Sequence, residues 1–231
     1  MATLTIDTLE GTQSFAAYRA DPVETPRAAV IVIQEIFGVN AGIRAKCDRL
    51  AEQGYLAIAP DLFWRLAPGI ELNPDVPEEM ERALALMGQF DQVTAIADIE
   101  ATIRAARALV AGGKVGAIGF CLGGRLAYMT AARTDVDASV GYYAVGIDGL
   151  LDEKHAIAHP LMLHIAGADH FVPAEVQAAM HAGLDDHPRV TLHDYPGEDH
   201  GFASELGARR SEVAAGLADE RTNAFLREAL A

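Results

Sequence analysis

Short apolar runs alternate with helix-like stretches along most of this 231-residue chain, and this alternation restricts the fold more than any other feature. Most of the runs lack the alternating apolar and polar pattern of a half-exposed strand, as expected for strands that are covered on both faces. They lie at Ala28–Gln34, Tyr55–Ala59, Val115–Phe120, Ala138–Tyr143, Leu161–Ala166 and Val190–Tyr195. Repeated strand–helix units predict an open, mostly parallel α/β sheet flanked by helices on both faces.

Helices are predicted between these strands. In Ile43–Gln53 the apolar residues recur at helical spacing, and Gly54 follows as a C-terminal stop. The segments Thr3–Asp7 and Ser14–Arg19 alternate apolar and polar residues, which predicts a hairpin at the sheet edge. The other predicted helices are Ala83–Met87, Val93–Val110, Arg125–Arg133 and Ser211–Leu230. No repeat or linker divides the sequence, so we expect a single domain over residues 1–231.

Composition limits the partners that the chain can have. Its 33 acidic residues outnumber 18 Lys and Arg, for a net charge of −15. Nucleic acids and anionic membranes bind clustered basic residues, so we expect neither as a partner and favour a small-molecule function. The two cysteines form neither a disulfide framework nor a metal-ligand spacing. The N-terminal residues do not resemble a secretory signal, and no apolar run reaches the ~18–20 residues that span a bilayer. We expect a reduced, cytoplasmic protein, either a monomer or a weak homodimer.

A sharp strand-to-helix turn is predicted at Cys121. The sequence Gly119-Phe120-Cys121-Leu122-Gly123 matches a nucleophile elbow, in which the residue at the tip has a strained backbone and only small residues fit two places before and after it. The N–H groups at the start of the following helix favour a thiolate and an oxyanion. The simpler interpretation is a buried cysteine at a strand end, but the strand-to-helix context favours a nucleophile.

An acid and a histidine are expected after later strands, in that order along the chain. Asp169 and His200 each follow one of the last two predicted strands, so we predict a triad of Cys121, His200 and Asp169. His170 is ambiguous, because it adjoins the predicted acid and could line the same cleft. Asp199 is interpreted as a surface carboxylate, the usual place for an aspartate.

The loop Gln34–Gly38 follows the first strand of the predicted parallel sheet. In this topology the loop supplies one N–H group of an oxyanion hole, and the residue after the nucleophile supplies the other. We assign these groups to Ile36 and Leu122. A carboxylate at Glu35 either takes part in the chemistry or lies at the surface, because an unpaired buried charge is costly. Cys47, on the apolar face of a predicted helix, is interpreted as a core residue.

Taken together, these motifs resemble the dienelactone hydrolase family of α/β hydrolases, which includes the carboxymethylenebutenolidases. The resemblance runs from about Ala28 to the C-terminus. It is carried by QEIFG (34–38), PDLFW (60–64), GFCLGG (119–124), GYYAVG (141–146), GADHFVP (167–173) and HGF (200–202). It implies an α/β-hydrolase fold without a metal or cofactor, and a triad of Cys121, His200 and Asp169 that cleaves small esters or lactones through an acyl-enzyme. It also implies that the Glu35 carboxylate holds the resting Cys121 thiol neutral until substrate displaces it.

The chain departs from the family pattern where substrate would bind. Family members that act on dienelactone have two arginines that bind the substrate carboxylate, one shortly after the histidine loop and one in the segment leading to a helix. Here the first place is Ser204, and the second region, Pro77–Met80, is acidic. Arg82 lies close by and could compensate. The residues expected to contact substrate are Arg82, Phe37, Tyr142 and Ser204.

Two alternatives to ester or lactone hydrolysis stay open. The same triad could hydrolyse thioesters or other acyl compounds. Alternatively, the protein could be a thiol-based binder or redox sensor in which Cys121 reacts with an electrophile or peroxide without turnover.

Overall fold

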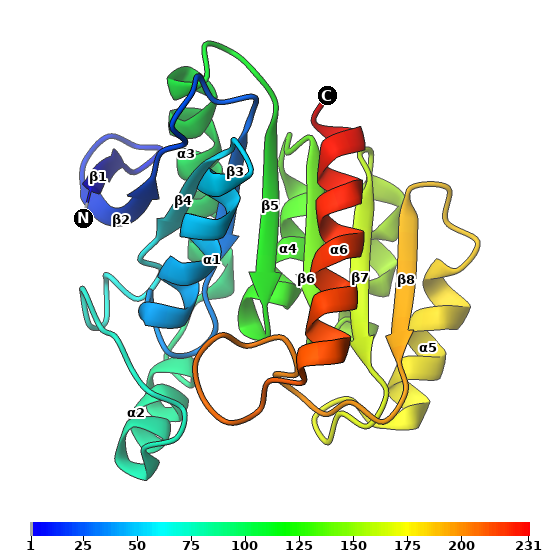
Figure 1. The fold of residues 1–231 in the computed structure, drawn as a ribbon. Helices are drawn as coiled ribbons and strands as arrows, with labels where there is room; N and C mark the ends of the chain where they lie inside the picture. The colour runs from blue at the N-terminus through cyan, green and yellow to red at the C-terminus, as the bar shows by residue number, and fades with distance from the viewer. Residues whose placement is uncertain (1) are drawn as a thin grey trace.

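An eight-stranded sheet forms the centre of the structure, a computed structural model that describes residues 2–231. The strands follow the order β1-β2-β4-β3-β5-β6-β7-β8 across the sheet, as Figure 1 shows. From β4 to β8 neighbouring strands are parallel, whereas β1 pairs with β2 and β2 with β4 in antiparallel register. The bounds are β1 Ala2–Asp7, β2 Ser14–Ala20, β3 Ala29–Ile33, β4 Leu56–Pro60, β5 Val115–Phe120, β6 Ala138–Tyr142, β7 Leu161–Ala166 and β8 Val190–Tyr195. The predicted parallel sheet and edge hairpin are therefore confirmed.

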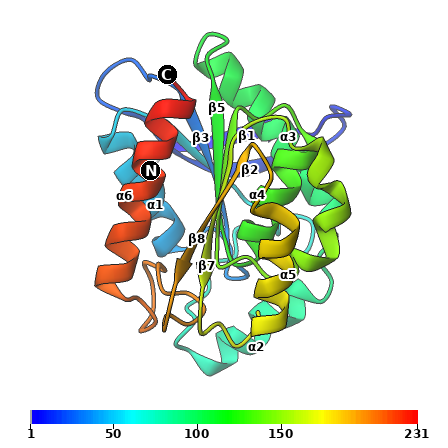
Figure 2. The same ribbon diagram turned by 90° about the vertical axis from the view of Figure 1, so that its right-hand side faces the viewer.

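Helices cover both faces of this sheet. Helices α1 and α6 lie on one face, and α3, α4 and α5 lie on the other (Figure 2). Because β3, β4, β5, β6 and β7 are buried along their whole length, each face carries its own apolar core. The bounds are α1 Ala41–Glu52, α2 Pro77–Met87, α3 Gln92–Leu109, α4 Leu122–Arg133, α5 Ala174–Leu184 and α6 Glu212–Ala229, with a 3₁₀ segment η1 at Asp148–Ala156. No helix within residues 2–231 is long and apolar enough to cross a membrane.

Two elements were not predicted, and helix α2 begins well before its predicted start. Helix α5 begins directly after Pro173, and only Met180 and Leu184 of its residues are buried. Such a narrow apolar stripe gives little helical periodicity to read. The η1 segment buries Leu150 alone. Helix α2 starts six residues before the predicted Ala83, because Pro77 occupies its first turn, where a missing N–H costs nothing.

The loops at the carboxyl ends of the parallel strands gather at one end of the molecule. This is the lower end of the sheet in Figure 1, where residues 196–211 cross beneath the strands and α2 lies alongside. The N–H of Ala208 in the crossing loop donates to Asp75 Oδ1 at 3.3 Å, so the crossing loop is joined to the segment that leads into α2. Every residue predicted from the sequence to take part in the chemistry lies in this set of loops or at the start of α4.

Candidate active site

The turn between β5 and α4 is a strained elbow with Cys121 at its tip. Cys121 has φ 56° and ψ −115°, a left-handed conformation that L-residues with a side chain rarely adopt. A Cβ placed on Gly119 would lie 1.8 Å from the carbonyl oxygen of Gly123, and one on Gly123 would lie 2.3 Å from that of Ile33. Glycine is therefore required at both places, as the sequence pattern predicts, and the tight approach lifts the Cys121 side chain to the end of the sheet.

His200 and Asp169 form a buried pair at the ends of the loops that follow β8 and β7. His200 Nδ1 lies 2.8 Å from Asp169 Oδ2, and both residues are at most 5% exposed. The second carboxylate oxygen, Oδ1, accepts the backbone N–H of Phe171 at 2.8 Å, which fixes the orientation of the carboxylate. The structure thus brings together the predicted acid and histidine in the chain order expected for this topology.

The environment of His200 favours its protonated form. Burial by itself disfavours the imidazolium, but hydrogen bonding to Asp169 and to the Cys121 side chain, together with the charges of both, raises the pKa of His200 to about 10. A histidine that keeps its proton to such high pH is suited to stabilise a neighbouring thiolate.

Leu122 and Ile36 are the residues predicted to supply the N–H groups of an oxyanion hole. Leu122 is the first residue of α4, where N–H groups have no partner within the helix. Ile36 lies in the loop after β3, and β3 pairs directly with β5, so this loop ends beside the elbow. After this loop the chain enters α1 at Asn40, whose side-chain oxygen accepts the N–H groups of Gly42 and Ile43. The start of α4 and the beginning of this loop lie close together, since a Cβ on Gly123 would lie 2.3 Å from the Ile33 carbonyl oxygen and 2.6 Å from that of Gln34.

Glu35 is a buried carboxyl group with two hydroxyl neighbours. It is 8% exposed, its Oε1 lies 3.3 Å from the Tyr143 hydroxyl, and its Oε2 lies 3.3 Å from Ser204 Oγ. Burial raises the pKa of Glu35, while the charge of His200 and the two hydroxyls oppose the shift. The alternative of a surface glutamate is therefore wrong.

The contact between Glu35 and the resting thiol that the resemblance implies is not formed in this structure. Among residues 2–231, the hydrogen-bond partners of the Glu35 carboxyl oxygens are Tyr143 and Ser204. A buried carboxyl group needs hydrogen-bond partners, and the hydroxyls of Tyr143 and Ser204 are the partners of Glu35 in place of the expected Cys121 thiol.

Ser204, predicted from the sequence as a substrate contact, contacts Glu35 and the crossing loop. The serine is 7% exposed, and its Oγ lies 3.0 Å from the Leu206 carbonyl as well as 3.3 Å from Glu35. A hydroxyl has one proton, so it can donate to only one of these oxygens at a time. If Ser204 donates to Leu206, a protonated Glu35 can donate to Ser204, which fits the raised pKa of Glu35.

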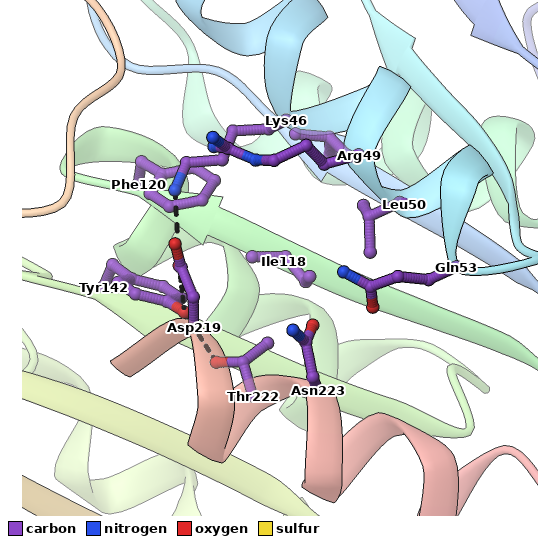
Figure 3. Close-up of a pocket in the computed structure, with 11 residues that line it drawn as sticks. Lys46, Arg49, Leu50, Gln53, Ile118, Phe120, Tyr142, Asp219, Thr222 and Asn223 are labelled. Atoms are coloured by element: carbon purple, nitrogen blue, oxygen red, sulfur yellow. Dashed lines mark hydrogen bonds and ion pairs between the residues drawn. The ribbon is translucent and has the colours of Figure 1, made fainter. Parts of the chain in front are cut away.

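The hydroxyl of Tyr142, another predicted substrate contact, is bonded to side chains of α6. Its hydroxyl lies 2.6 Å from Thr222 Oγ1 and 3.2 Å from Asp219 Oδ1, inside a cavity of about 120 Å³ between α1 and α6 (Figure 3). The charged groups of this cavity pair with one another, since Lys46 Nζ lies 3.4 Å from Asp219. The following residue, Tyr143, comes after the end of β6, and its ring packs against His200.

Tyr143 is the residue that sequence reasoning missed. It has φ 37°, its N–H donates to the His164 carbonyl at 2.8 Å, and its ring packs edge-on against His200 with 5.1 Å between ring centroids. The position directly after a parallel strand was the available signal, because ligands of such sheets bind beyond the strand ends.

Of the other two predicted substrate contacts, Phe37 is buried and Arg82 is exposed. Phe37 is 4% exposed and packs in the core on the α3 side. Arg82 is exposed on α2, whose first turn carries Glu78 and Glu79. A further arginine that the sequence did not single out, Arg209, is exposed and packs its side chain against Gly201, next to His200.

Asp199 and His170 lie at the rim of the site. Their side chains are 60% and 56% exposed, and Asp199 Oδ1 lies 2.8 Å from His170 Nδ1. Together with Asp169 they form the one cluster within residues 2–231 whose spacing suits a metal ion. The oxygens of Asp169 already accept hydrogen bonds from His200 and Phe171, so a metal would have to displace them.

Cys47, the other cysteine, lies in the apolar core and not in the candidate active site. Cys47 is fully buried in the core between α1 and the sheet, and burial raises the pKa of its thiol, with the charge of Asp48 adding to the effect. Its interpretation as a core residue is confirmed.

Comparison with known proteins agrees with this geometry. The model of the dienelactone hydrolase family matches residues 15–230. A carboxymethylenebutenolidase of Pseudomonas putida is 39% identical over 224 residues, covering 96% of this chain and 94% of that protein. A protein of Azospirillum brasilense is 47% identical over 220 residues, covering 94% of each chain. A solved structure from Klebsiella pneumoniae superposes with a TM-score of 0.82 at 28% identity, covering 98% of this chain and 99% of that one. The fold is the α/β-hydrolase fold, and the chain belongs to the dienelactone hydrolase family.

Proposed function

We propose that this protein hydrolyses small carboxylic esters or lactones through a Cys121, His200, Asp169 triad. The observation that carries the proposal is the strained elbow at Cys121, placed next to a buried His200 that is already paired with Asp169. A lactone as substrate is supported by the relatives that are carboxymethylenebutenolidases. The expectation of a cytoplasmic protein, and of a monomer or weak homodimer, remains part of this proposal.

The proposed reaction uses these groups in turn. Transfer of the thiol proton to His200 gives a thiolate and an imidazolium, which the raised pKa of His200 favours, and the Cys121 sulfur then attacks the carbonyl carbon of the substrate. The negative charge that develops on the carbonyl oxygen is stabilised by the N–H groups of Leu122 and Ile36. The tetrahedral intermediate collapses to an acyl-enzyme as His200 gives its proton to the leaving alcohol. A water, activated by the now neutral imidazole, releases the acid and restores the thiol.

The proposal is tested by following product release at substrate concentrations far above that of the enzyme. We expect steady hydrolysis of p-nitrophenyl acetate over many turnovers. A thiol-based binder or redox sensor would instead stop after one equivalent, and that result would overturn the proposed function. Parallel assays with matched oxygen esters and thioesters separate ester hydrolysis from the thioester alternative.

We expect a neutral ester or lactone to be hydrolysed at least as efficiently as its free-carboxylate counterpart. Ser204 interacts with Glu35 and Leu206, and α2 presents Glu78 and Glu79 where a cation would be needed. A charge-assisted hydrogen bond is worth roughly 1.5–3 kcal/mol, so two missing ones would weaken transition-state binding of an anion by about 10²–10⁴-fold. The measurement is the ratio of kcat/KM values for dienelactone and its methyl ester at low salt.

A strong preference for the carboxylate would contradict this expectation and indicate another cation. Arg82 and Arg209 are the two candidates at this end of the sheet. Replacing each by alanine identifies which one binds the anion, since only the variant that removes the binding cation raises KM for dienelactone without raising it for the methyl ester.

Glu35→Gln is expected to speed the alkylation of Cys121 by iodoacetamide. The ionised Glu35 carboxylate attracts His200 and so competes with the thiolate for the imidazolium. A neighbouring charge in a protein is worth about 1–2 kcal/mol, so its loss should raise the alkylation rate by about tenfold. Because the pKa of Glu35 is raised, the two proteins should differ least at low pH, where Glu35 is protonated, and most at high pH, where it is ionised.

Asp61→Asn is the matched control for this substitution. Asp61 is a second buried carboxyl group whose pKa is raised by burial, but its oxygens accept N–H groups of Phe63 and Gly69. Alkylation in this variant should follow the wild type. Equal alkylation rates in Glu35→Gln and wild type across the pH range would show that Glu35 does not influence the thiol.

A further inference from the structure

A partly exposed carboxylate beside the proposed triad joins the two loops that carry Asp169 and His200. Asp199 Oδ1 accepts the backbone N–H of His200 at 2.7 Å and that of His170 at 3.3 Å, and it lies 2.8 Å from the ring Nδ1 of His170. We call these three contacts the Asp199 bridge. Because His170 follows Asp169 directly, the bridge connects the chain at positions adjacent to both members of the catalytic pair.

The catalytic pair depends on the relative position of these two loops. They follow different strands, β7 and β8, and the 2.8 Å contact between His200 Nδ1 and Asp169 Oδ2 forms only if both loops hold their place. The main chain supplies two further connections, since the N–H of Gly167 donates to the Tyr195 carbonyl at 3.0 Å and that of Ala168 to the Glu198 carbonyl at 2.8 Å. On the His200 loop Asp199 lies one residue nearer to His200 than Glu198 does, and on the other loop both Ala168 and His170 adjoin Asp169.

The bridge also fixes the rings of His170 and Phe171 beside the His200 imidazole. The His170 ring, held by Asp199, lies against the Phe171 ring with 3.9 Å between centroids. The Phe171 ring in turn packs edge-on against His200 at 4.9 Å, although its side chain is half exposed. A displacement of the His170 ring would therefore also move the Phe171 ring, and through it the His200 imidazole.

We propose that Asp199 is a positioning residue that holds His200 in hydrogen-bonding reach of Asp169. The inference rests on the proposed triad and adds to it a residue outside the reacting groups. The bond to the His200 amide should carry most of the effect, because the contact with His170 is exposed to solvent and weakened by it. Hydrogen bonding to His170 and to the His200 N–H lowers the pKa of Asp199 to about 2, so the carboxylate is charged at any working pH.

The test compares Asp199→Ala with Asp199→Asn. Asp199→Ala removes every acceptor, and kcat for p-nitrophenyl acetate should fall by about 10–100-fold with KM changed by less than about threefold, the result of misplaced catalytic groups. Asp199→Asn keeps an oxygen for the His200 amide and should retain kcat within about fivefold of wild type.

Asp185→Ala is the matched control. Asp185 is also exposed and bonded to a histidine, with Oδ1 2.9 Å from His181 Nδ1, but it lies at the far end of α5 from the triad. Its kcat should equal that of wild type. The proton NMR resonance of the His200 Nδ1–H, shifted downfield by Asp169, should move or broaden in Asp199→Ala and stay in place in Asp185→Ala.

The outcomes distinguish this inference from the proposed function. If Cys121→Ala is inactive while Asp199→Ala keeps kcat within twofold of wild type, the positioning role is refuted and the triad stands. A loss of kcat in Asp199→Ala with an unchanged His200 resonance also refutes it, because the imidazole has then kept its place. If Cys121→Ala remains active, the triad itself fails and the Asp199 bridge has no catalytic pair to position.

Discussion

Cys121→Ala should reduce kcat by about 10⁴-fold or more, because no other group at the elbow can form the acyl-enzyme. The fold should survive the change. The strain of the elbow comes from a side chain at φ 56°, and alanine carries the same Cβ as cysteine, so the substitution adds no new backbone cost. The measurement is steady-state hydrolysis of p-nitrophenyl acetate by purified variant, with the thermal unfolding temperature as the check on folding.

Cys47→Ala is the control for this loss. It removes a fully buried thiol from the core beside α1, which should lower stability by about 1 kcal/mol and leave kcat unchanged. Iodoacetamide should inactivate this variant as it does the wild type, because Cys121 is still present. Retention of more than a few per cent of activity in Cys121→Ala would show that Cys121 is not the nucleophile.

Local patterns in the sequence were sufficient to predict most of the sheet. Strands buried on both faces appear as continuous apolar runs, and the predicted and observed bounds of β5, β7 and β8 coincide. Helix α5 was missed because it buries only two of its residues, so its contribution to the core leaves little trace in the sequence. The elbow was recognised because a sharp turn imposes glycine at two fixed positions, a requirement that is local in the chain.

Contacts between distant segments could not be predicted in the same way. Tyr142 and Tyr143 are adjacent and chemically alike, and only the end of β6 decides which of them faces His200. The pairing of Glu35 with Tyr143 and Ser204 joins three loops that are far apart in sequence, so no spacing rule points to it. Asp199 was interpreted as a surface carboxylate because aspartate usually lies at the surface, and its side chain is indeed 60% exposed, yet it accepts the backbone N–H of His200.

His200→Ala should lower kcat by about 10²–10⁴-fold, the usual contribution of a general base, and Asp169→Asn should cost a similar or smaller factor. In Asp169→Asn the side-chain oxygen can stay on the Phe171 N–H, which places the NH₂ group against His200 Nδ1. The imidazole would then carry its proton on Nε2, the nitrogen that must accept the proton of Cys121. The expected loss of kcat in Asp169→Asn therefore comes from the wrong imidazole tautomer and not from unfolding.

The pH dependence of stability gives an independent measurement of the same pair. The pKa of His200 is raised from its ordinary 6.5 to about 10 in the folded protein, so its protonation stabilises the fold fully below pH 6.5, and this stabilisation is lost as the pH rises towards 10. Asp169→Asn removes a large part of that stabilisation. The difference in unfolding free energy between wild type and Asp169→Asn should accordingly be largest at about pH 6 and shrink towards pH 10. The opposite result would be an unfolding free-energy difference that stays constant over this pH range, with near wild-type kcat in both His200→Ala and Asp169→Asn. That result would show that Asp169 and His200 do not act as a catalytic pair, even if Cys121 is the nucleophile.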